Sequence, residues 1–175
     1  GLTVVQGDAL DVDLEELLGG GPWLAAGNLP YSVATPIVRR ILATPGLFPA
    51  AVFMVQEEVA RRLVARPGDR ARGLLTVEVE CGATVEYLRQ VGPRCFAPPP
   101  KVVSAVVRLT ARPSPHPPEM LRAAVALASV AFQHRRKKIA NAVEGKVARE
   151  AIVAALERIV PEFQPAAAET RRGAP

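Results

Sequence analysis

The sequence predicts an α/β protein whose sheet is mostly parallel and is covered by helices on both faces. Two apolar runs, 23–26 and 51–55, have the continuous hydrophobicity of strands buried on both sides. A segment with helical periodicity follows each of them, over 36–42 and 57–65. Beyond the proline-rich stretch 111–118 the apolar spacing becomes helical, which predicts a small all-helical domain.

The first elements are a strand and a short helix. Residues 2–5 (Leu-Thr-Val-Val) predict a buried strand that ends at Gly7-Asp8-Ala9-Leu10. Asp13, with Glu16 three residues later, forms a capping box that starts a helix. Glycines 19–21 stop this helix. Its predicted buried face consists of Leu14, Leu17 and Leu18.

The second helix follows the stretch GNLPYSVATP at 27–36. Thr35 can cap this helix, with Pro36 at its first position. Its apolar stripe is expected to be Ile37, Val38, Ile41 and Leu42. Further along, residues 74–80 alternate in the manner of a strand.

The remaining strands are predicted at 85–88 and 102–109, near a sheet edge. Three prolines at 98–100 make the connection between them stiff and extended. These elements predict a first domain over 1–110, a linker over 111–118 and a helical domain over 119–165, before a disordered tail at 166–175.

The helical domain has an apolar stripe at helical spacing, and a last helix is expected over roughly 147–159. The stripe consists of Leu121, Val125, Ala128, Phe132, Ile139 and Val143.

Composition narrows the class of protein. The 175 residues carry a net charge of +5, which favours polyanionic partners. No apolar run approaches the roughly 20 residues of a membrane span, and the chain opens without signal-peptide features, so a cytoplasmic protein is expected. Cys81 and Cys95 form neither a disulfide framework nor a zinc site, and no metal is predicted.

The stretch Asn28-Leu29-Pro30-Tyr31 lies where a strand ends and a helix begins, the edge at which open α/β sheets bind ligands. An ordinary turn accounts for an asparagine and a proline there. Methyl transfer to an exocyclic amine also fits. The amide oxygen of Asn28 and the carbonyl of Leu29 would accept the two N–H groups, Pro30 would aim that carbonyl, and Tyr31 would stack on the base.

Four segments resemble the ribosomal RNA adenine N6-dimethyltransferases, the KsgA family and its relatives that confer erythromycin resistance. GNLPYSVATPIV resembles motif IV of that family, and Gly7-Asp8-Ala9-Leu10 resembles its GDAL segment. Residues 95–107 resemble its F-x-PPPKV-x-SAVV signature, and 132–141 its F-x-x-RRK-x-x-x-N helix. The resemblance implies a Rossmann-like methyltransferase fold that uses S-adenosylmethionine, and it favours a helix rather than a strand at 74–82.

The resemblance also implies roles for individual residues. Asp8 and Ala9 would bind the cofactor adenine, and Asn28 would hold the target N6 and border the cofactor. Tyr31 and Phe96 would stack on the flipped target adenine. Two structural interpretations remain possible: Asp8 could be only a turn residue, and Phe96 could pack in the core beside the prolines.

Basic residues are expected to contact RNA phosphates, which positions RNA without reading its sequence. A solvated helix face is the ordinary alternative for such a charge run. The candidates are Arg135, Arg136, Lys137 and Lys138 in the helical domain, with Arg61, Arg62 and Lys101 in the first domain.

One departure from the family pattern concerns the cofactor. The family begins with a strand, a glycine-rich turn and an acidic residue for the cofactor ribose. This sequence does not contain that segment, so the fold is expected to be partial, with N-terminal strands missing. We therefore expect weak or absent binding of S-adenosylmethionine by this chain alone, and a sheet edge that invites dimerisation.

The expected function is N6-dimethylation of adenines in small-subunit ribosomal RNA during ribosome assembly, with this chain alone inactive. A non-catalytic RNA-binding or assembly factor is an alternative. A DNA adenine methyltransferase is another, but such enzymes commonly carry DPPY, and Asn28 with the proline-rich signature speaks against it.

Overall fold

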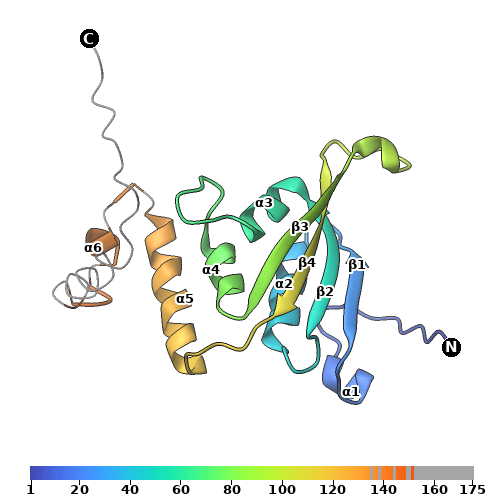
Figure 1. Cartoon of the computed structure of the whole chain (residues 1–175), viewed down its shortest axis with the longest axis horizontal. Helices are drawn as coiled ribbons and strands as arrows, with labels where there is room; N and C mark the ends of the chain where they lie inside the picture. The colour runs from blue at the N-terminus through green and yellow to red at the C-terminus, as the bar shows by residue number, and fades with distance from the viewer. Residues whose placement is uncertain (135, 138, 144, 149–150, 152–175) are drawn as a thin grey trace, which may run out of the picture. The chain divides into compact units, whose positions relative to one another are not determined.

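The computed structural model describes residues 1–134, 136–137, 139–143, 145–148 and 151. The chain divides into two compact units, 1–125 and 126–175, and the division falls within the helix α5 (Pro118–Gln133). The first unit contains the sheet and the first four helices (Figure 1).

Four strands form one sheet in the order β1-β2-β4-β3. These strands are β1 (Leu24–Asn28), β2 (Ala50–Gln56), β3 (Ala83–Val91) and β4 (Ser104–Ala111). β1 and β2 are parallel, whereas β4 is antiparallel to both β2 and β3. The predicted mostly parallel pairing is therefore wrong for this sheet. The chain reverses after β3, and β4 inserts between β2 and β3, so both ladders of β4 are antiparallel.

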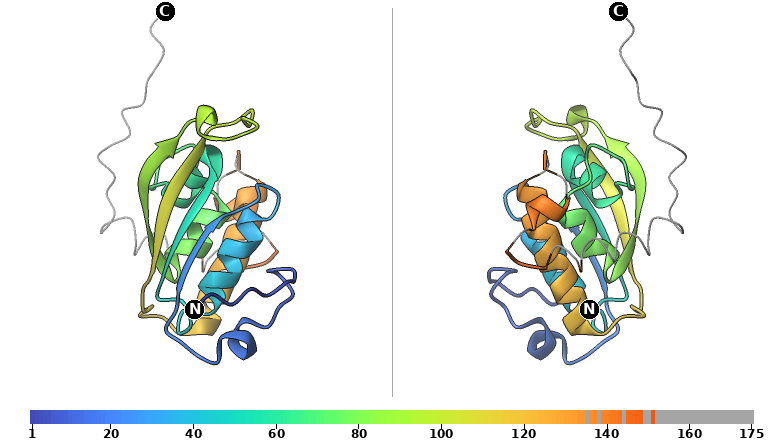
Figure 2. Two further views of the ribbon diagram at one scale, coloured as in Figure 1. Left: turned by 90° about the vertical axis from the view of Figure 1, so that its right-hand side faces the viewer. Right: turned by 90° about the vertical axis from the view of Figure 1, so that its left-hand side faces the viewer.

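One face of the sheet is buried beneath helices. Figure 2 shows α2 (Ala34–Ala43) and α4 (Leu74–Glu80) on one side of the sheet. The core contains alternate residues of the two central strands together with Val38 of α2 and Val79 of α4. These strand residues are Ala51, Phe53 and Val55 of β2 and Ala105, Val107 and Leu109 of β4.

The opposite face is open within the described residues, so the expectation of a sheet covered on both faces is wrong there. Leu24 is 79% exposed and Val52 is 38% exposed. An ion pair between Arg108 and Glu86 crosses from β4 to β3 on this face. Side chains along β2 point alternately to the two faces of the sheet, so one face is packed and the other is partly apolar and faces solvent.

The N-terminal segment contains one correct prediction and two wrong ones. Residues 2–5 form no strand, and Leu2 is 91% exposed, because an apolar run becomes a strand only where a neighbour pairs with it. In α1 (Leu14–Leu18), Asp13 Oδ1 accepts the Glu15 and Glu16 N–H groups, which confirms Asp13 as the cap but not the reciprocal bond of a capping box. Leu17 is 43% exposed, so the predicted buried face is narrower than expected.

The helix α2 starts earlier than predicted. Val33, rather than Thr35, is its cap, so Thr35 and Pro36 lie within the first turn. The Val33 N–H donates to the Pro30 carbonyl, which winds the preceding turn in the helical sense before α2 begins. The predicted stripe is confirmed: Val38 and Ile41 are buried, while Ile37 and Leu42 pack partly buried against the core.

The structure shows that most of the ambiguous stretch at 74–82 is helical rather than extended. It forms the helix α4, with Leu75, Thr76 and Val79 buried. The predicted helix after β2 is α3 (Glu57–Leu63). Strands were expected at 85–88 and 102–109 near a sheet edge; β3 is an edge strand, but β4 is central. The short 3-10 helix η1 (Pro93–Cys95) begins the connection between them.

The C-terminal unit is described in part. The predicted stripe is confirmed only in part: its members in α5 are partly buried, whereas Ile139 of α6 (Ile139–Ala142) is 44% exposed and Val143 is buried just after that helix. Most of the expected last helix and all of the tail lie outside the described residues. Among the helices that the structure does describe, none has the length and apolarity needed to cross a membrane.

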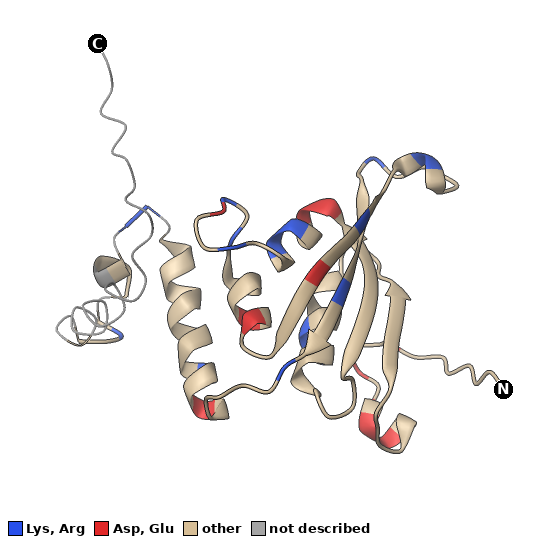
Figure 3. Ribbon diagram, in the orientation of Figure 1, with Lys and Arg blue, Asp and Glu red and all other residues tan. Residues whose placement is uncertain are grey.

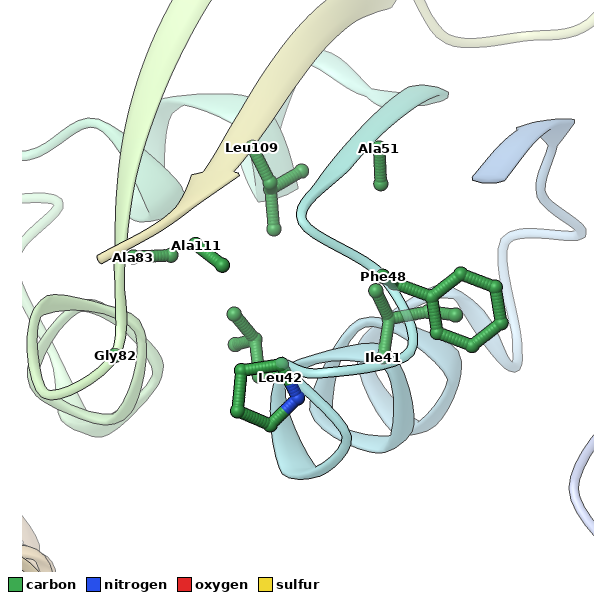
Figure 4. Close-up of a pocket in the computed structure, with 9 residues that line it drawn as sticks. Ile41, Leu42, Phe48, Ala51, Gly82, Ala83, Leu109 and Ala111 are labelled. Atoms are coloured by element: carbon green, nitrogen blue, oxygen red, sulfur yellow. The ribbon is translucent and has the colours of Figure 1, made fainter. Parts of the chain in front are cut away.

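A small cavity lies between α2 and the sheet (Figure 4). Its walls are apolar and include Leu42, Phe48, Ala83 and Leu109, and its volume is about 10 Å³. This volume is close to that of a single water. We therefore regard the cavity as a packing gap rather than a binding site.

Candidate active site

The stretch 27–36 forms a turn that is fixed at both ends. Asn28 is the last residue of β1, and its side chain is exposed. Leu29 is buried, and its N–H donates to the Met54 carbonyl at 3.0 Å. The Pro30 carbonyl accepts the Val33 N–H at 3.1 Å. The buried leucine and the two hydrogen bonds hold Asn28 at the carboxyl edge of the sheet.

Tyr31 links this turn to β4. Its ring is 37% exposed, and its hydroxyl lies 2.9 Å from Ser104 Oγ. Ser104 is only 1% exposed, so the hydroxyl end of the tyrosine is anchored while part of the ring faces solvent. The NLPY turn and the SAVV segment, which the resemblance selected independently, therefore meet. Sequence reasoning did not identify Ser104, because a serine before an apolar run carries no signal of its own.

Phe96 is half-buried and follows η1, where its N–H donates to the Pro93 carbonyl at 3.2 Å. It lies in the connection that leads through the prolines to Ser104. The proposed stacking role of Phe96 stays a prediction.

The Asp8 loop is held by its own turn and by α2. Asp8 Oδ1 accepts the Leu10 N–H at 2.8 Å, as expected of a turn residue, and Ala9 is exposed. Arg40 donates to the carbonyls of Leu10 and Val12. Arg40 belongs to the last turn of α2, whereas Asn28 precedes its first turn. The structure therefore gives no contact that brings Asp8 to Asn28.

Two of the three basic candidates in the first unit are ion-paired, and Figure 3 marks the positions of the lysines and arginines on the ribbon. Arg61 and Arg62 form ion pairs with Glu57 and Glu58, one helical turn earlier in α3. Lys101 is exposed beyond the proline run. Because both arginine side chains remain more than half exposed, they can still meet a phosphate, but with their charge partly compensated.

In the second unit, Arg136 and Lys137 are exposed, and the Lys137 N–H donates to the His134 carbonyl. Arg135 and Lys138, the other two cations of this run, lie outside the described residues. Over the described part of the chain, no group of three or more His, Cys, Asp or Glu side chains is arranged to hold a metal ion.

A second polar cluster lies at the start of α3. The Glu57 N–H donates to the Val103 carbonyl at 3.0 Å, and Tyr87 of β3 donates its hydroxyl to Glu57 Oε2 at 2.6 Å. Burial raises the pKa of Tyr87, and the hydrogen bond to Glu57 raises it further. The phenol therefore remains a donor at neutral pH.

Comparison with known proteins places these features in context. A family described as ribosomal RNA adenine dimethylase matches residues 1–170. A ribosomal RNA small subunit methyltransferase A from Synechococcus sp. (strain JA-3-3Ab) is 41% identical over 160 residues, covering 89% of this chain and 56% of that protein. The protein of the same name from Rhodospirillum rubrum is 40% identical over 154 residues, covering 88% and 53%. The chain thus spans about half the length of these relatives.

Solved structures of RNA methyltransferases are also similar to this chain. A dimethyladenosine transferase from Plasmodium falciparum matches with a TM-score of 0.65 at 25% identity, covering 90% of this chain and 54% of that one. The 23S rRNA methyltransferase ErmE matches with a TM-score of 0.68 at 27% identity, covering 87% and 60%. The predicted Rossmann-like methyltransferase fold is thereby confirmed.

Proposed function

Because the chain belongs to the ribosomal RNA adenine dimethylase family, we propose that it is part of an enzyme that transfers methyl groups to adenine N6 in small-subunit ribosomal RNA. The methyl donor would be S-adenosylmethionine, and the substrate an assembling small subunit in the cytoplasm. The names of the two curated relatives described above support this RNA class. The observation that carries the proposal is the exposed amide of Asn28 at the strand end, beside the anchored Tyr31.

The proposed chemistry uses few groups of the protein. The adenine amino nitrogen is a poor nucleophile because its lone pair is delocalised into the ring. Asn28 Oδ1 and the Leu29 carbonyl would accept its two hydrogens, which localises the lone pair and directs it away from the ring plane. Tyr31, with its hydroxyl held by Ser104, would stack on the extruded base.

S-adenosylmethionine, when bound, supplies a methyl group on a positively charged sulfur. Asn28 Oδ1 and the Leu29 carbonyl would hold N6 toward that methyl group, the sulfur would keep the electrons of the broken carbon–sulfur bond as the N6–carbon bond forms, and the N6 proton would pass to solvent water. Asp8 and Ala9 are exposed and fit the adenine end of this molecule, since a carboxylate accepts from an amino group. The weak affinity expected of this chain alone stays a prediction, which calorimetric titration tests.

The proposal is tested at Asn28. Because this chain alone is expected to be inactive, the assay uses the chain joined to the family's N-terminal glycine-rich segment. In that protein we expect Asn28→Ala to abolish methyl incorporation into unmodified small-subunit particles, because one of the two acceptors for N6 is lost, while particle binding persists. Ser32→Ala, a change at an exposed residue of the same turn, is the control and should leave both unchanged. Methyl transfer by Asn28→Ala at the wild-type rate would exclude the proposed role of this amide.

The same experiment separates the alternatives. A non-catalytic assembly factor would bind particles without any methyl incorporation, even when the wild-type chain is joined to the N-terminal glycine-rich segment. A DNA adenine methyltransferase would instead modify duplex DNA.

We also propose self-association through β1. This strand ends the sheet order and pairs only with β2 among the described strands. Its exposed Leu24 lies on the open face. Sedimentation at increasing concentration tests this proposal.

A further inference from the structure

A second hollow lies beside the start of α3, apart from the Asn28 turn. Its volume is about 350 Å³, which falls at the lower end of small-ligand pockets. The residues around it are Glu57, Arg61, Val64, Tyr87 and Gln90, so α3 supplies one wall and β3 the other. Its lining is both apolar and polar: the Tyr87 ring and Val64 are apolar, whereas the other side chains can form hydrogen bonds.

Glu57 fixes the two groups that face this hollow. Its Oε2 accepts the Tyr87 hydroxyl at 2.6 Å, and its Oε1 lies 2.8 Å from Arg61 Nη2. Although that pair is close, Oε1 is buried and accepts no well-aligned hydrogen bond from the described residues, so we regard the contact as an ion pair only. One carboxylate thereby orients an aromatic ring and a guanidinium toward the same space.

Stability does not explain this arrangement well. The Arg61 side chain is 67% exposed, and exposed ion pairs contribute little to folding. Tyr87 remains 37% exposed despite its hydrogen bond. A large aromatic ring held in place yet left open to solvent is instead a common feature of surfaces that bind a planar group.

The hollow is connected to the candidate active site. The Glu57 N–H donates to the Val103 carbonyl, and the next residue, Ser104, holds the Tyr31 hydroxyl. In the parallel register Asn28 pairs with Met54, three residues before Glu57. Asn28 and Glu57, which anchors the hollow, therefore lie at the carboxyl ends of the neighbouring strands β1 and β2, where α/β sheets bind ligands.

The chemistry of the walls fits a nucleotide. Tyr87 offers a face for a base, the Gln90 amide can both donate to and accept from a base edge, and Arg61 keeps further N–H groups for a phosphate. We propose that this hollow holds a nucleotide of the substrate RNA that neighbours the target adenine, with its base against Tyr87. The inference rests on the proposed function, because it takes the substrate to be a single-stranded stretch of RNA.

Substitution at Tyr87 provides the first test. The readout is the affinity for a labelled single-stranded RNA of about eight nucleotides, measured by fluorescence anisotropy. We expect Tyr87→Ala to weaken binding by about 5- to 100-fold, which corresponds to the loss of one base stack. Tyr87→Phe keeps the ring and should bind within about threefold of wild type. Leu88→Ala, an exposed neighbour on the same strand, is the matched control and should not change the affinity.

Photo-crosslinking provides a second test that needs no variant. RNA that carries 4-thiouridine beside the target adenine should crosslink to peptides that contain Tyr87. Crosslinks confined to other peptides, or unchanged RNA affinity in Tyr87→Ala, would overturn the nucleotide site. If Asn28→Ala still abolished methyl transfer in that case, the proposed function would stand without it. A wild-type protein that neither binds nor methylates RNA would overturn both.

Discussion

At the scale of single residues, the contact between Tyr31 and Ser104 organises the candidate site. These residues are 73 positions apart, and their side-chain oxygens lie 2.9 Å from each other. The residue types at 28–31 are enough to predict a turn between a strand and a helix, whereas its role in holding an amine stays a prediction. The serine could not be predicted, because a hydroxyl donor or acceptor is recognised only once the fold brings its partner within reach.

We expect the Tyr31–Ser104 pair to be energetically coupled. Ser104→Ala should lower the free energy of unfolding by about 1 kcal/mol, since it removes the partner of a partly buried hydroxyl. Tyr31→Phe should cost less in the Ser104→Ala background than in wild type, by about 0.5–1.5 kcal/mol. Urea denaturation of the two single variants and the double variant measures this difference. Strictly additive effects would show that the hydrogen bond contributes nothing.

The two cysteines should differ in reactivity. Burial raises the pKa of Cys81, and the nearby Glu80 carboxylate raises it further, so less of the reactive thiolate exists at pH 8. Cys95 is exposed. We expect iodoacetamide to modify Cys95 first, as followed by mass spectrometry of the peptides. Faster labelling of Cys81 would contradict its environment in the structure.

The raised pKa of Cys81 also has a consequence for stability. Because the folded state favours the neutral thiol, this contribution is fully present below the unfolded value of 9.0 and is lost as pH rises through the higher folded value.

At the scale of elements, helix ends were predicted well where one residue determines them. α1 begins after Asp13, whose side chain caps the first N–H groups, and ends at Gly19, which adopts a left-handed backbone conformation. The alternation of apolar and polar residues at 74–80 indicated a strand, but this segment forms a helix. Leu75, Thr76 and Val79 also share one helical face, and tertiary packing decided between the two patterns. The position of β4 between β2 and β3 could not be predicted, since strand order depends on contacts between distant segments.

Two glycines near helix ends should respond oppositely to alanine. Gly82 follows α4 without a positive φ, and an added Cβ would meet no atom within 4 Å. Gly82→Ala should therefore stabilise the protein by about 0.5 kcal/mol, because the unfolded chain loses freedom. Gly19 closes α1 at a φ of 65°, so Gly19→Ala should destabilise it by about 1 kcal/mol. Thermal unfolding of both variants checks the signs; the same sign for both would contradict the backbone geometry.

At the scale of the whole molecule, the chain has an excess of positive charge, and its described residues cover one face of the sheet. The net charge of +5 overstates the uncompensated positive charge at individual arginines, because Arg61, Arg62 and Arg108 are all ion-paired. Composition predicted a polyanionic partner but could not reveal this pairing, which depends on which carboxylates the fold places nearby.

The difference in pairing leads to a prediction about salt. Each phosphate contact to single-stranded RNA contributes about 0.7 to the slope of log affinity against log salt. Arg136 and Lys137 are exposed and lie in the basic run. If both contact phosphates, replacing them together with glutamine should reduce the magnitude of that slope by about 1.4. Arg108→Gln, which removes a cation paired with Glu86, should change the slope far less. Fluorescence anisotropy titrations over a range of salt concentrations measure all three proteins. An unchanged slope in the double variant would mean that this run is only a solvated surface, and that RNA is held elsewhere.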